Sequence, residues 1–316
     1  MAGFFETKCE SPGTYQIDSL HAMSQSDTSP VTHYPTTIMK GTNTSMSTKK
    51  IFFADLDGTL LNSQKIITPL TRKALDNFVA AGNYFAINTG RGLDSAKAVR
   101  NELGLDYNRM FLVAFNGAEI YDCDKAVDIY RTGLSLDLVP EIFAIAKKYG
   151  IHCQTYRDDA IITADNGEAM QFYNRVIHTP IVITDDFVKE LPEEPCKILA
   201  IELHDLEALE AFRLEIMAQF GDRVNTIYSH PTYLEIIPIE AGKGTAIGKL
   251  CDILGIDVKD SISAGDEQND ISMIEAAGTG IAMANATDIV KASADIVTKL
   301  DNDHDGLAEY LESFVS

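Results

Sequence analysis

Two aspartates separated by one residue, Asp55 and Asp57, carry the strongest chemical signal in this chain. They follow the apolar run 51–54 and precede Gly58, which lets the backbone turn sharply. Two carboxylates this close repel one another unless a cation lies between them, and a hard divalent ion with oxygen ligands, Mg²⁺ above all, satisfies that need. The spacing therefore predicts a magnesium site at the end of a buried strand.

Three further polar clusters follow apolar runs or open predicted helices. A hydroxyl and free backbone N–H groups at a strand-to-helix junction can hold phosphate, although the first cluster alone is also explained as a helix N-cap. A lysine that opens a helix opposes the helix dipole, which indicates an anion nearby. The last cluster brings another carboxylate to a strand end. The clusters are Thr89-Gly90-Arg91, then Lys243, then Asp266 with Asn269 and Asp270.

Alternating strands and helices must position these residues. The hydrophobic spacing after residue 49 predicts strands and helices in the order β-α-β-α-β, which is typical of an α/β fold with a doubly wound parallel sheet, Rossmann-like in topology. Ligands of such sheets bind beyond the C-terminal ends of the strands, where the polar clusters stand. The predicted strands are 51–54, 84–88 and 110–115, and the predicted helices are 68–81 and 93–102.

The middle of the chain has a different pattern and predicts an α+β domain inserted over 131–233. It combines predicted helices with hairpin-like strands, whereas strand and helix patterns alternate again after Gly242. We therefore predict a flexible N-terminal extension over 1–48 and an α/β core made of 49–130 and 234–316. The predicted helices of the insert are 138–149 and 206–220, and those of the returning core are 245–254, 271–277, 288–292 and 306–314.

The composition limits the partners. The 316 residues include 26 Lys and Arg against 47 Asp and Glu, a net charge of −21, and 45% are hydrophobic. Such a charge argues against nucleic acid and anionic membranes. No apolar run approaches the roughly 20 residues of a membrane span. Five cysteines, odd in number and without a CxxC pair, indicate reduced thiols, and with the lack of a signal-like N-terminus they predict a cytoplasmic protein.

The same acidity does not oppose an anionic substrate, because the excess charge is unevenly distributed. Segment 49–130, which contains the Asp55–Asp57 pair and the Thr89-Gly90-Arg91 cluster, has ten acidic and ten basic residues. Magnesium, Lys243 and backbone N–H groups would set the sign of the local field at a phosphate.

Together these segments resemble the four motifs of the haloacid dehalogenase-like hydrolase superfamily. The Asn-Thr-Gly-Arg form of the second motif, the large insert before the third, and the Gly-Asp-x-x-Asn-Asp form of the fourth are similar to its Cof-type phosphatase branch. The insert resembles the C2 class of cap. The resemblance covers about 49–316 and leaves 1–48 unexplained.

The resemblance implies a role for each residue. Asp55 would be the nucleophile that forms an aspartyl-phosphate, and Asp57 would be the general acid and base. Asp55, the backbone carbonyl of Asp57, and Asp266 would hold Mg²⁺, with Asp270 bracing them from behind. The remaining residues would bind the substrate phosphate, Lys243 with a catalytic role as well: Thr89, Gly90, Arg91, Lys243 and Asn269.

These roles predict a Mg²⁺-dependent phosphatase for small phosphorylated metabolites. Among the candidate substrates, the family resemblance favours sugar phosphates. A phosphomutase of the same superfamily is the main alternative, and a catalytically silent metabolite-sensing regulator is another. The substrate, the oligomeric state and the role of 1–48 stay open. The candidates for reading the leaving group lie on the cap: Tyr156, Arg157, Asp158, Asp159, Asn174, Arg175, His178 and His230.

One rival pattern stands near the C-terminus. Asp301, Asp303 and Asp305, followed by Gly306 and Glu312, match the calcium loop of an EF-hand. An EF-hand needs a helix before the loop, whereas 294–299 is β-branched and predicts a strand. We therefore expect Asp305 to cap the C-terminal helix instead.

Overall fold

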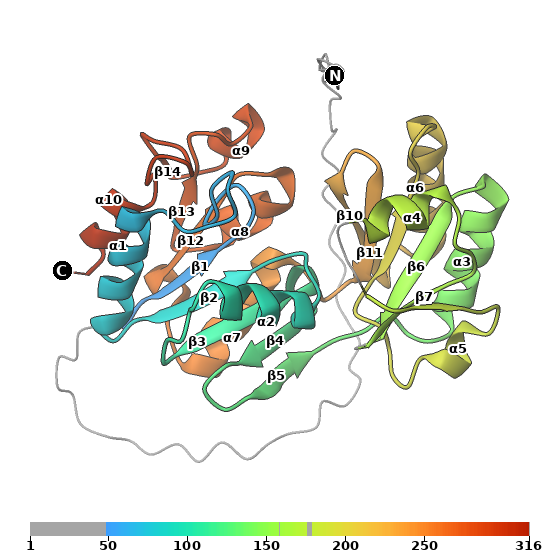
Figure 1. Ribbon diagram of the computed structural model, residues 1–316, viewed down its shortest axis with the longest axis horizontal. Helices are drawn as coiled ribbons and strands as arrows, with labels where there is room; N and C mark the ends of the chain where they lie inside the picture. Colours follow the sequence, from blue (N-terminus) through green and yellow to red (C-terminus); the bar gives the residue numbers. More distant parts are fainter. Residues whose placement is uncertain (1–48, 158, 176–178, 316) are drawn as a thin grey trace, which may run out of the picture. The chain divides into compact units, whose positions relative to one another are not determined.

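The computed structural model describes residues 49–157, 159–175 and 179–315. The predictions for the extension 1–48 and for Asp158 and His178 lie outside the described residues. The described residues form two sheets, one from the predicted α/β segments and one mainly from the predicted insert 131–233, whose last strand, β11 (Tyr233–Pro238), runs on beyond the insert (Figure 1).

The first sheet has eight strands and positions the candidate site. Its first six strands in spatial order are parallel to one another, and each of the last two is antiparallel to the strand before it. The parallel part confirms the predicted α/β fold, and strand 110–115 ends one residue earlier than predicted. The spatial order is β14 (Ile296–Val297), β13 (Thr279–Ala282), β12 (Ser261–Gly265), β1 (Ile51–Ala54), β2 (Tyr84–Asn88), β3 (Met110–Ala114), β4 (Glu119–Asp122) and β5 (Val127–Arg131).

The hairpin β4–β5 is an addition that the sequence analysis did not predict. Strand β5 is partly or fully exposed along its length, so it lacks the apolar alternation that marks a half-buried strand. Hydrogen-bonded pairing with β4 defines β5 as a strand, and the sequence of β5 by itself does not contain that information.

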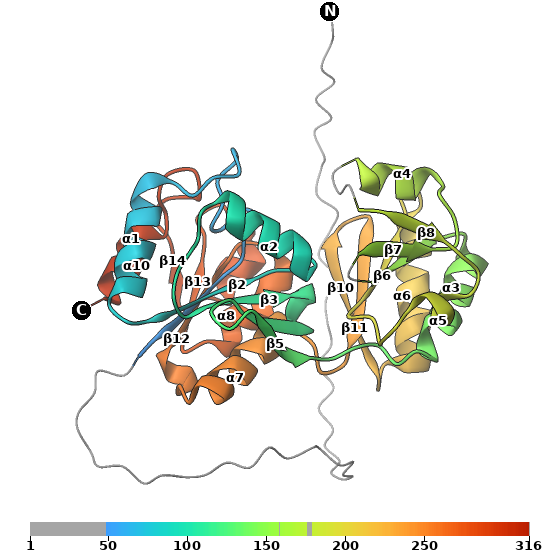
Figure 2. The same cartoon turned by 60° about the horizontal axis from the view of Figure 1, so that its bottom comes forward.

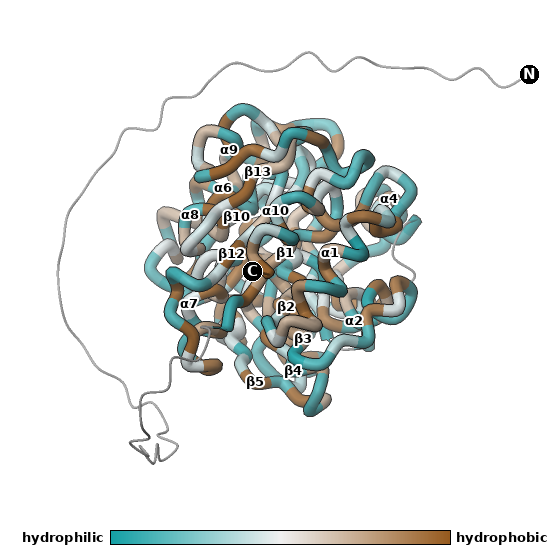
Figure 3. The backbone as a smooth tube through the Cα atoms, turned by 90° about the vertical axis from the view of Figure 1, so that its left-hand side faces the viewer, coloured by the Kyte–Doolittle hydropathy of each residue, from teal (hydrophilic) through white to brown (hydrophobic). Residues whose placement is uncertain are grey.

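Helices cover both faces of this sheet. Phe52 and Phe53 on β1 point to opposite sides, because side chains alternate along a strand. Phe52 packs with α1 (Pro69–Ala80), α2 (Leu93–Glu102) and α10 (Ala308–Ser313). Phe53 packs with α7 (Lys243–Leu254) and α8 (Ile271–Ala276). Figure 2 shows α2 and α7 on opposite sides of the strands, and Figure 3 shows the apolar stretches of the chain in brown.

The second sheet has six strands and belongs to the insert. All neighbours are antiparallel except β7 and β8. One face packs against α3 (Leu138–Tyr149), α5 (Phe187–Glu190) and α6 (Leu206–Phe220), and the other against α4 (Glu168–Asn174). The spatial order is β10 (Val224–His230), β11 (Tyr233–Pro238), β9 (Ile198–Ile201), β6 (His152–Arg157), β7 (Ala160–Thr163) and β8 (Ile181–Ile183).

Most predicted helices agree closely with the structure. Helices 93–102, 138–149, 206–220 and 288–292 have the predicted bounds, the last being α9 (Asp288–Ala292). Helix α7 starts two residues earlier than predicted, so Lys243 is its first residue. None of the helices among the described residues is long and apolar enough to span a membrane.

Asp305 does not cap the C-terminal helix, so this prediction is wrong. Its carboxylate instead accepts hydrogen bonds from the backbone N–H groups of Leu70 (2.9 Å) and Thr71 (3.1 Å), in the first turn of α1. Asp305 has a left-handed φ of 59°. Helix α10 starts only at Ala308 and has no side-chain cap.

The calcium alternative finds no support in this loop. The short strand β14 precedes it instead of a helix, as the β-branched run predicted. Asp303 accepts a hydrogen bond from the backbone of Ser63 (2.8 Å), and Asp301 contacts His304 (2.6 Å). These acidic side chains act as caps and turn partners, and they form no metal-ligand cluster within the described part of the chain.

Candidate active site

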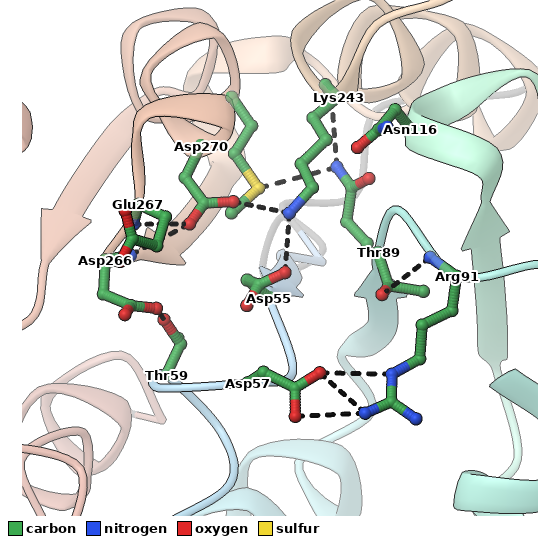
Figure 4. Close-up of polar contacts among 12 residues, drawn as sticks. Asp55, Asp57, Thr59, Thr89, Arg91, Asn116, Lys243, Asp266, Glu267 and Asp270 are labelled. Atoms are coloured by element: carbon green, nitrogen blue, oxygen red, sulfur yellow. Dashed lines mark hydrogen bonds and ion pairs between the residues drawn. The ribbon is translucent and has the colours of Figure 1, made fainter. Parts of the chain in front are cut away.

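The polar clusters come together at the C-terminal ends of the parallel strands. Asp55 directly follows β1, Thr89 directly follows β2, and Asp266 directly follows β12, while Lys243 opens α7 (Figure 4). Strand β1 lies between β2 and β12, so their polar ends are neighbours. The predicted convergence of these segments is therefore present in the fold.

Lys243 joins Asp55 at the end of β1 to Asp270 of the last cluster. Its Nζ lies 2.6 Å from Oδ1 of Asp55 and 2.5 Å from Oδ1 of Asp270, and the residue is 1% exposed. Although burial alone would lower it, the pKa of the Lys243 ammonium is raised well above its usual range by Asp270 and Asp55. Lys243 is thus a fixed buried cation beside Asp55.

Asp55 and Asp266 are acidic groups in an environment that disfavours negative charge. Burial raises the pKa of Asp55 to about 7, and the charges of Asp270 and Asp266 act in the same direction against the Lys243 ammonium. Burial also raises the pKa of Asp266 to about 7, with Asp270 and Glu267 adding to it. One lysine does not compensate these carboxylates, so the site has a need for a further cation.

The donor set fits Mg²⁺. Asp55, Asp266 and Asp270 each offer a carboxylate oxygen, and these atoms lie within 4.8 Å of one another. Asp270, however, uses one oxygen for Lys243 and the other for the backbone N–H groups of Asp266 and Glu267, at 3.0 Å each. Asp55 and Asp266 are therefore the better ligands, and Asp270 braces the Asp266 turn.

Gly58 makes room for this cluster. Its φ is +87°, and a Cβ there would run into the carboxylate of Asp266. The neighbouring Thr59 donates a hydrogen bond to Oδ1 of Asp266 (2.7 Å). The turn after β1 thus contacts Asp266 directly, which orients this carboxylate toward Asp55.

Asp57 stands apart from the metal-ligand cluster. Its carboxylate, 40% exposed, pairs with the guanidinium of Arg91 at 2.8 Å and the ammonium of Lys65 at 2.7 Å. Although burial acts the other way, these hydrogen bonds and charges lower the pKa of Asp57 below its usual value. The side chain of Arg91, expected at the phosphate, is engaged with Asp57 in this structure.

The loop after β2 has the features of a phosphate cradle. Thr89 is buried, and its Oγ1 accepts a hydrogen bond from the backbone N–H of Arg91 (3.2 Å). Asn269 lies on a single 3₁₀ turn, partly exposed, and so stays a candidate without an observed contact to the cluster among the described residues.

Several residues of the site lie outside the predicted set. Thr59 and Lys65 follow β1, and Asn88 donates to the backbone carbonyl of Lys243 (3.0 Å). Asn116 and Glu235 join through a 2.7 Å hydrogen bond. The polar ends of β2 and β3 signalled Asn88 and Asn116, whereas nothing local signalled Glu235.

The predicted cap residues that the structure describes make different kinds of contact. Tyr156 is partly buried, and its hydroxyl donates to that of Tyr173 (2.9 Å). Arg157 instead pairs with Asp159 and Glu190. Asn174, Arg175 and His230 make no contact with the polar clusters among the described residues.

Comparisons with known proteins agree with this geometry. The haloacid dehalogenase-like hydrolase family matches residues 52–311. The 5-amino-6-(5-phospho-D-ribitylamino)uracil phosphatase YwtE of Bacillus subtilis is 31% identical over 291 residues, covering 84% of this chain and 98% of the relative. A second phosphatase of that name from the same organism, YitU, is 30% identical over 277 residues, covering 86% and 100%.

Solved structures agree as well. A haloacid dehalogenase-like hydrolase from Bacteroides thetaiotaomicron is 30% identical with a TM-score of 0.74, covering 84% of this chain and 99% of that chain. The subclass IIB sugar phosphatase BT4131 shares the fold, with a TM-score of 0.69 at 24% identity, covering 84% and 99%.

The chain belongs to the haloacid dehalogenase-like hydrolases. It is an enzyme of their Cof-type phosphatase branch, which confirms the resemblance seen in the motifs.

Proposed function

We propose that this enzyme is a Mg²⁺-dependent phosphatase of small phosphorylated metabolites that works through an aspartyl-phosphate on Asp55. The observation that carries the proposal is the unequal state of the two oxygens of Asp55. Oδ1 is fixed by Lys243, whereas Oδ2 has no hydrogen-bond partner among the described residues. An oriented carboxylate with one free oxygen is suited to attack phosphorus in line.

The chain's own residues account for the two steps. Oδ2 of Asp55 attacks phosphorus, the bond from phosphorus to the leaving oxygen breaks, and Asp57 gives that oxygen a proton. Water then attacks the same phosphorus, the bond to Asp55 breaks, and Asp57 takes the proton of the water. Bound Mg²⁺, held by Asp55, the Asp57 carbonyl and Asp266, would supply charge compensation for the phosphoryl oxygens.

Arg91 links phosphate binding to the proton donor. Asp57 must be protonated to act as an acid, yet its pairs with Arg91 and Lys65 keep it ionised here. A substrate phosphate competes for the guanidinium of Arg91, because bidentate pairing suits phosphate as well as carboxylate. We propose that this exchange raises the pKa of Asp57 when substrate binds. Thr89, the Gly90 backbone, Lys243 and Asn269 complete the proposed phosphate contacts.

For the substrate class we propose phosphorylated sugars and polyols. Two Bacillus relatives are named for a phosphorylated ribityl compound. The cap of this chain carries the partly buried Tyr156, whose hydroxyl is oriented by the buried Gln154 and Tyr173, and an oriented hydroxyl is suited to a neutral polyhydroxyl leaving group. A cytoplasmic location stays a prediction from the cysteine pattern and the N-terminal sequence.

A phosphate-release screen over phosphometabolites, with Mg²⁺ and with chelator, tests the function. We expect release that depends on Mg²⁺ and that Asp55→Asn abolishes, while Asp222→Asn, at an exposed position after α6, retains it. Near-normal release by Asp55→Asn would refute the nucleophile. Retention of the phosphate on a second hydroxyl of the substrate would instead identify a phosphomutase.

A further inference from the structure

A lysine of the cap contacts the phosphate-binding loop of the core. Lys197 precedes β9, and its Nζ donates to the backbone carbonyl of Gly90 (2.9 Å) and to Oε2 of Glu235 on β11 (3.1 Å). The side chains of both Lys197 and Glu235 are 6% exposed. Nothing in the motif pattern assigns a role to this buried ion pair.

Three consecutive carbonyls of the loop are held from outside the loop. The carbonyl of Thr89 accepts from the backbone N–H of Asn116 (3.0 Å), and that of Arg91 accepts from the backbone N–H of Phe115 (2.9 Å). Only the middle carbonyl, that of Gly90, depends on the cap, through Lys197. The core therefore orients the two outer peptides, and the cap orients the middle one.

The direction of that middle peptide matters for phosphate. In a trans peptide the C=O and the following N–H point to opposite sides. Since Lys197 fixes the carbonyl of Gly90 on one side, the N–H of Arg91 points to the other, where it meets Oγ1 of Thr89 at 3.2 Å. Glycine at position 90 offers little resistance to rotation, so an external partner is needed to keep this orientation.

The surroundings of Lys197 make the contact specific. Asn116 donates to the same oxygen of Glu235 (2.7 Å), so the acceptor of Lys197 is itself fixed by the core. The ammonium also lies 5.9 Å from the ring centre of Phe115 and 5.4 Å from that of Tyr156. A cation enclosed in this way, with a charged partner and two rings, has one defined position.

We propose that Lys197 is a positioning residue that aims the Gly90–Arg91 peptide at the phosphate, and so makes phosphate binding by the core depend on the cap. The inference rests on the proposed function, in which this loop binds the phosphoryl group. It predicts that loss of Lys197 weakens the binding of phosphate itself, whatever the leaving group.

Inorganic phosphate is the probe that tests this, because it has no leaving group for the cap to read. Its binding to the full-length protein with Mg²⁺ can be measured by calorimetry. We expect Lys197→Met to weaken phosphate binding about tenfold or more, since small misplacements of binding groups have large effects. Lys147→Met, at an exposed position on α3, should leave it unchanged. Lys197→Arg, which keeps a donor, should recover part of the affinity.

A second variant separates this role from simple instability. Lys197→Met leaves Glu235 as a buried uncompensated charge, which destabilises the protein. The double variant Lys197→Met with Glu235→Gln removes that charge and keeps an oxygen acceptor for Asn116. We expect it to regain thermal stability but not phosphate affinity. Recovery of both would show that Lys197 is merely structural and would overturn the proposal.

The kinetic pattern gives an independent outcome. If Lys197→Met binds inorganic phosphate like the wild type and raises only the KM of one substrate, Lys197 reads the leaving group and the proposal is wrong. A wild-type protein that binds phosphate but hydrolyses no phosphate ester would overturn the proposed phosphatase function and leave the role of Lys197 in phosphate binding intact. A wild type that binds no phosphate would overturn both.

Discussion

The carboxylates of Asp55, Asp57 and Asp270 differ in what each is free to do. Asp270 has both oxygens engaged, Asp55 has one engaged, and Asp57 is paired with the partly exposed Arg91 and the exposed Lys65. These states fit the bracing role that we propose for Asp270, the nucleophilic role for Asp55 and the proton-transferring role for Asp57. The environment, rather than the residue type, makes the assignment.

Gly58 offers a test of the metal site at this scale. Gly58→Ala should strongly weaken Mg²⁺ binding, because the new Cβ collides with the carboxylate of Asp266. The same change at Gly82 is the matched control, since its φ is +95° but nothing lies within 4 Å of the added Cβ. Both variants should have backbone strain of about 1 kcal/mol or more, and only Gly58→Ala should lose affinity in a Mg²⁺ titration. Equal affinities would argue against the proposed ligand geometry.

At the scale of elements, the C-terminal loop stabilises a helix at the other end of the described chain. Helix α1 has no side-chain cap from its own N-cap residue, Thr68, and receives one from Asp305 instead. Burial of Leu75 and Phe78 then fastens α1 to the sheet, next to α10. The loop that imitates a calcium site is therefore explained by helix capping.

Removal of this cap has a measurable cost. Asp305→Ala should lower the free energy of unfolding by about 1 kcal/mol, the usual value of an N-cap. Hydrogen bonds from Thr68, Thr71 and Leu70 outweigh the effect of burial and lower the pKa of Asp305 below 3.8. A lowered pKa means that the stabilisation is present above pH 3.8 and is lost as the pH falls through the folded-state value.

The pH dependence supplies the control for this prediction. The difference in unfolding free energy between wild type and Asp305→Ala should be constant from pH 5 to 7 and shrink in more acidic solution. Asp222→Ala, at an exposed position, should show no such difference in urea unfolding curves. Addition of Ca²⁺ should not stabilise the wild type more than Mg²⁺ does; selective stabilisation by Ca²⁺ would revive the calcium reading.

At the scale of the whole molecule, the net charge of −21 is compatible with an anionic substrate because the site has its own cations. Lys243 lies between two buried aspartates, and Lys197 reaches from the cap to the carbonyl of Gly90, in the loop that we propose to bind phosphate. The acidic groups near Lys243 outnumber it, which favours the divalent ion that we propose there.

Metal removal should therefore destabilise the protein. Saturation with Mg²⁺ at about 100 times its dissociation constant should stabilise the fold by about 2.7 kcal/mol, which corresponds to an increase in Tm of several degrees. Chelator should reverse the increase. Asp266→Asn should show a smaller response, because it removes one ligand charge, whereas Asp222→Asn should respond like the wild type. An unchanged response in Asp266→Asn would exclude this aspartate as a ligand.

Local sequence determined much of this protein. Apolar runs followed at once by Asp55, Thr89 or Asp266 predicted strands that end at polar groups, and parallel strands bring such ends to one edge of a sheet. Helices with clear periodicity, such as 138–149 and 206–220, have the predicted bounds. The half-exposed strand β5 escaped prediction, because its pairing and not its composition defines it.

Only the tertiary structure decided which side chains are partners. Arg91 meets Asp57 across 34 positions, Lys243 meets Asp55 across 188, and Asp305 reaches α1 across 235. Nothing in the local pattern distinguishes these pairs from other pairs of opposite charge, because an ion pair depends on the distance in space and on the water excluded around it. The sequence therefore determined which groups are available for chemistry, whereas the fold decided which of them are ionised, braced or free to react.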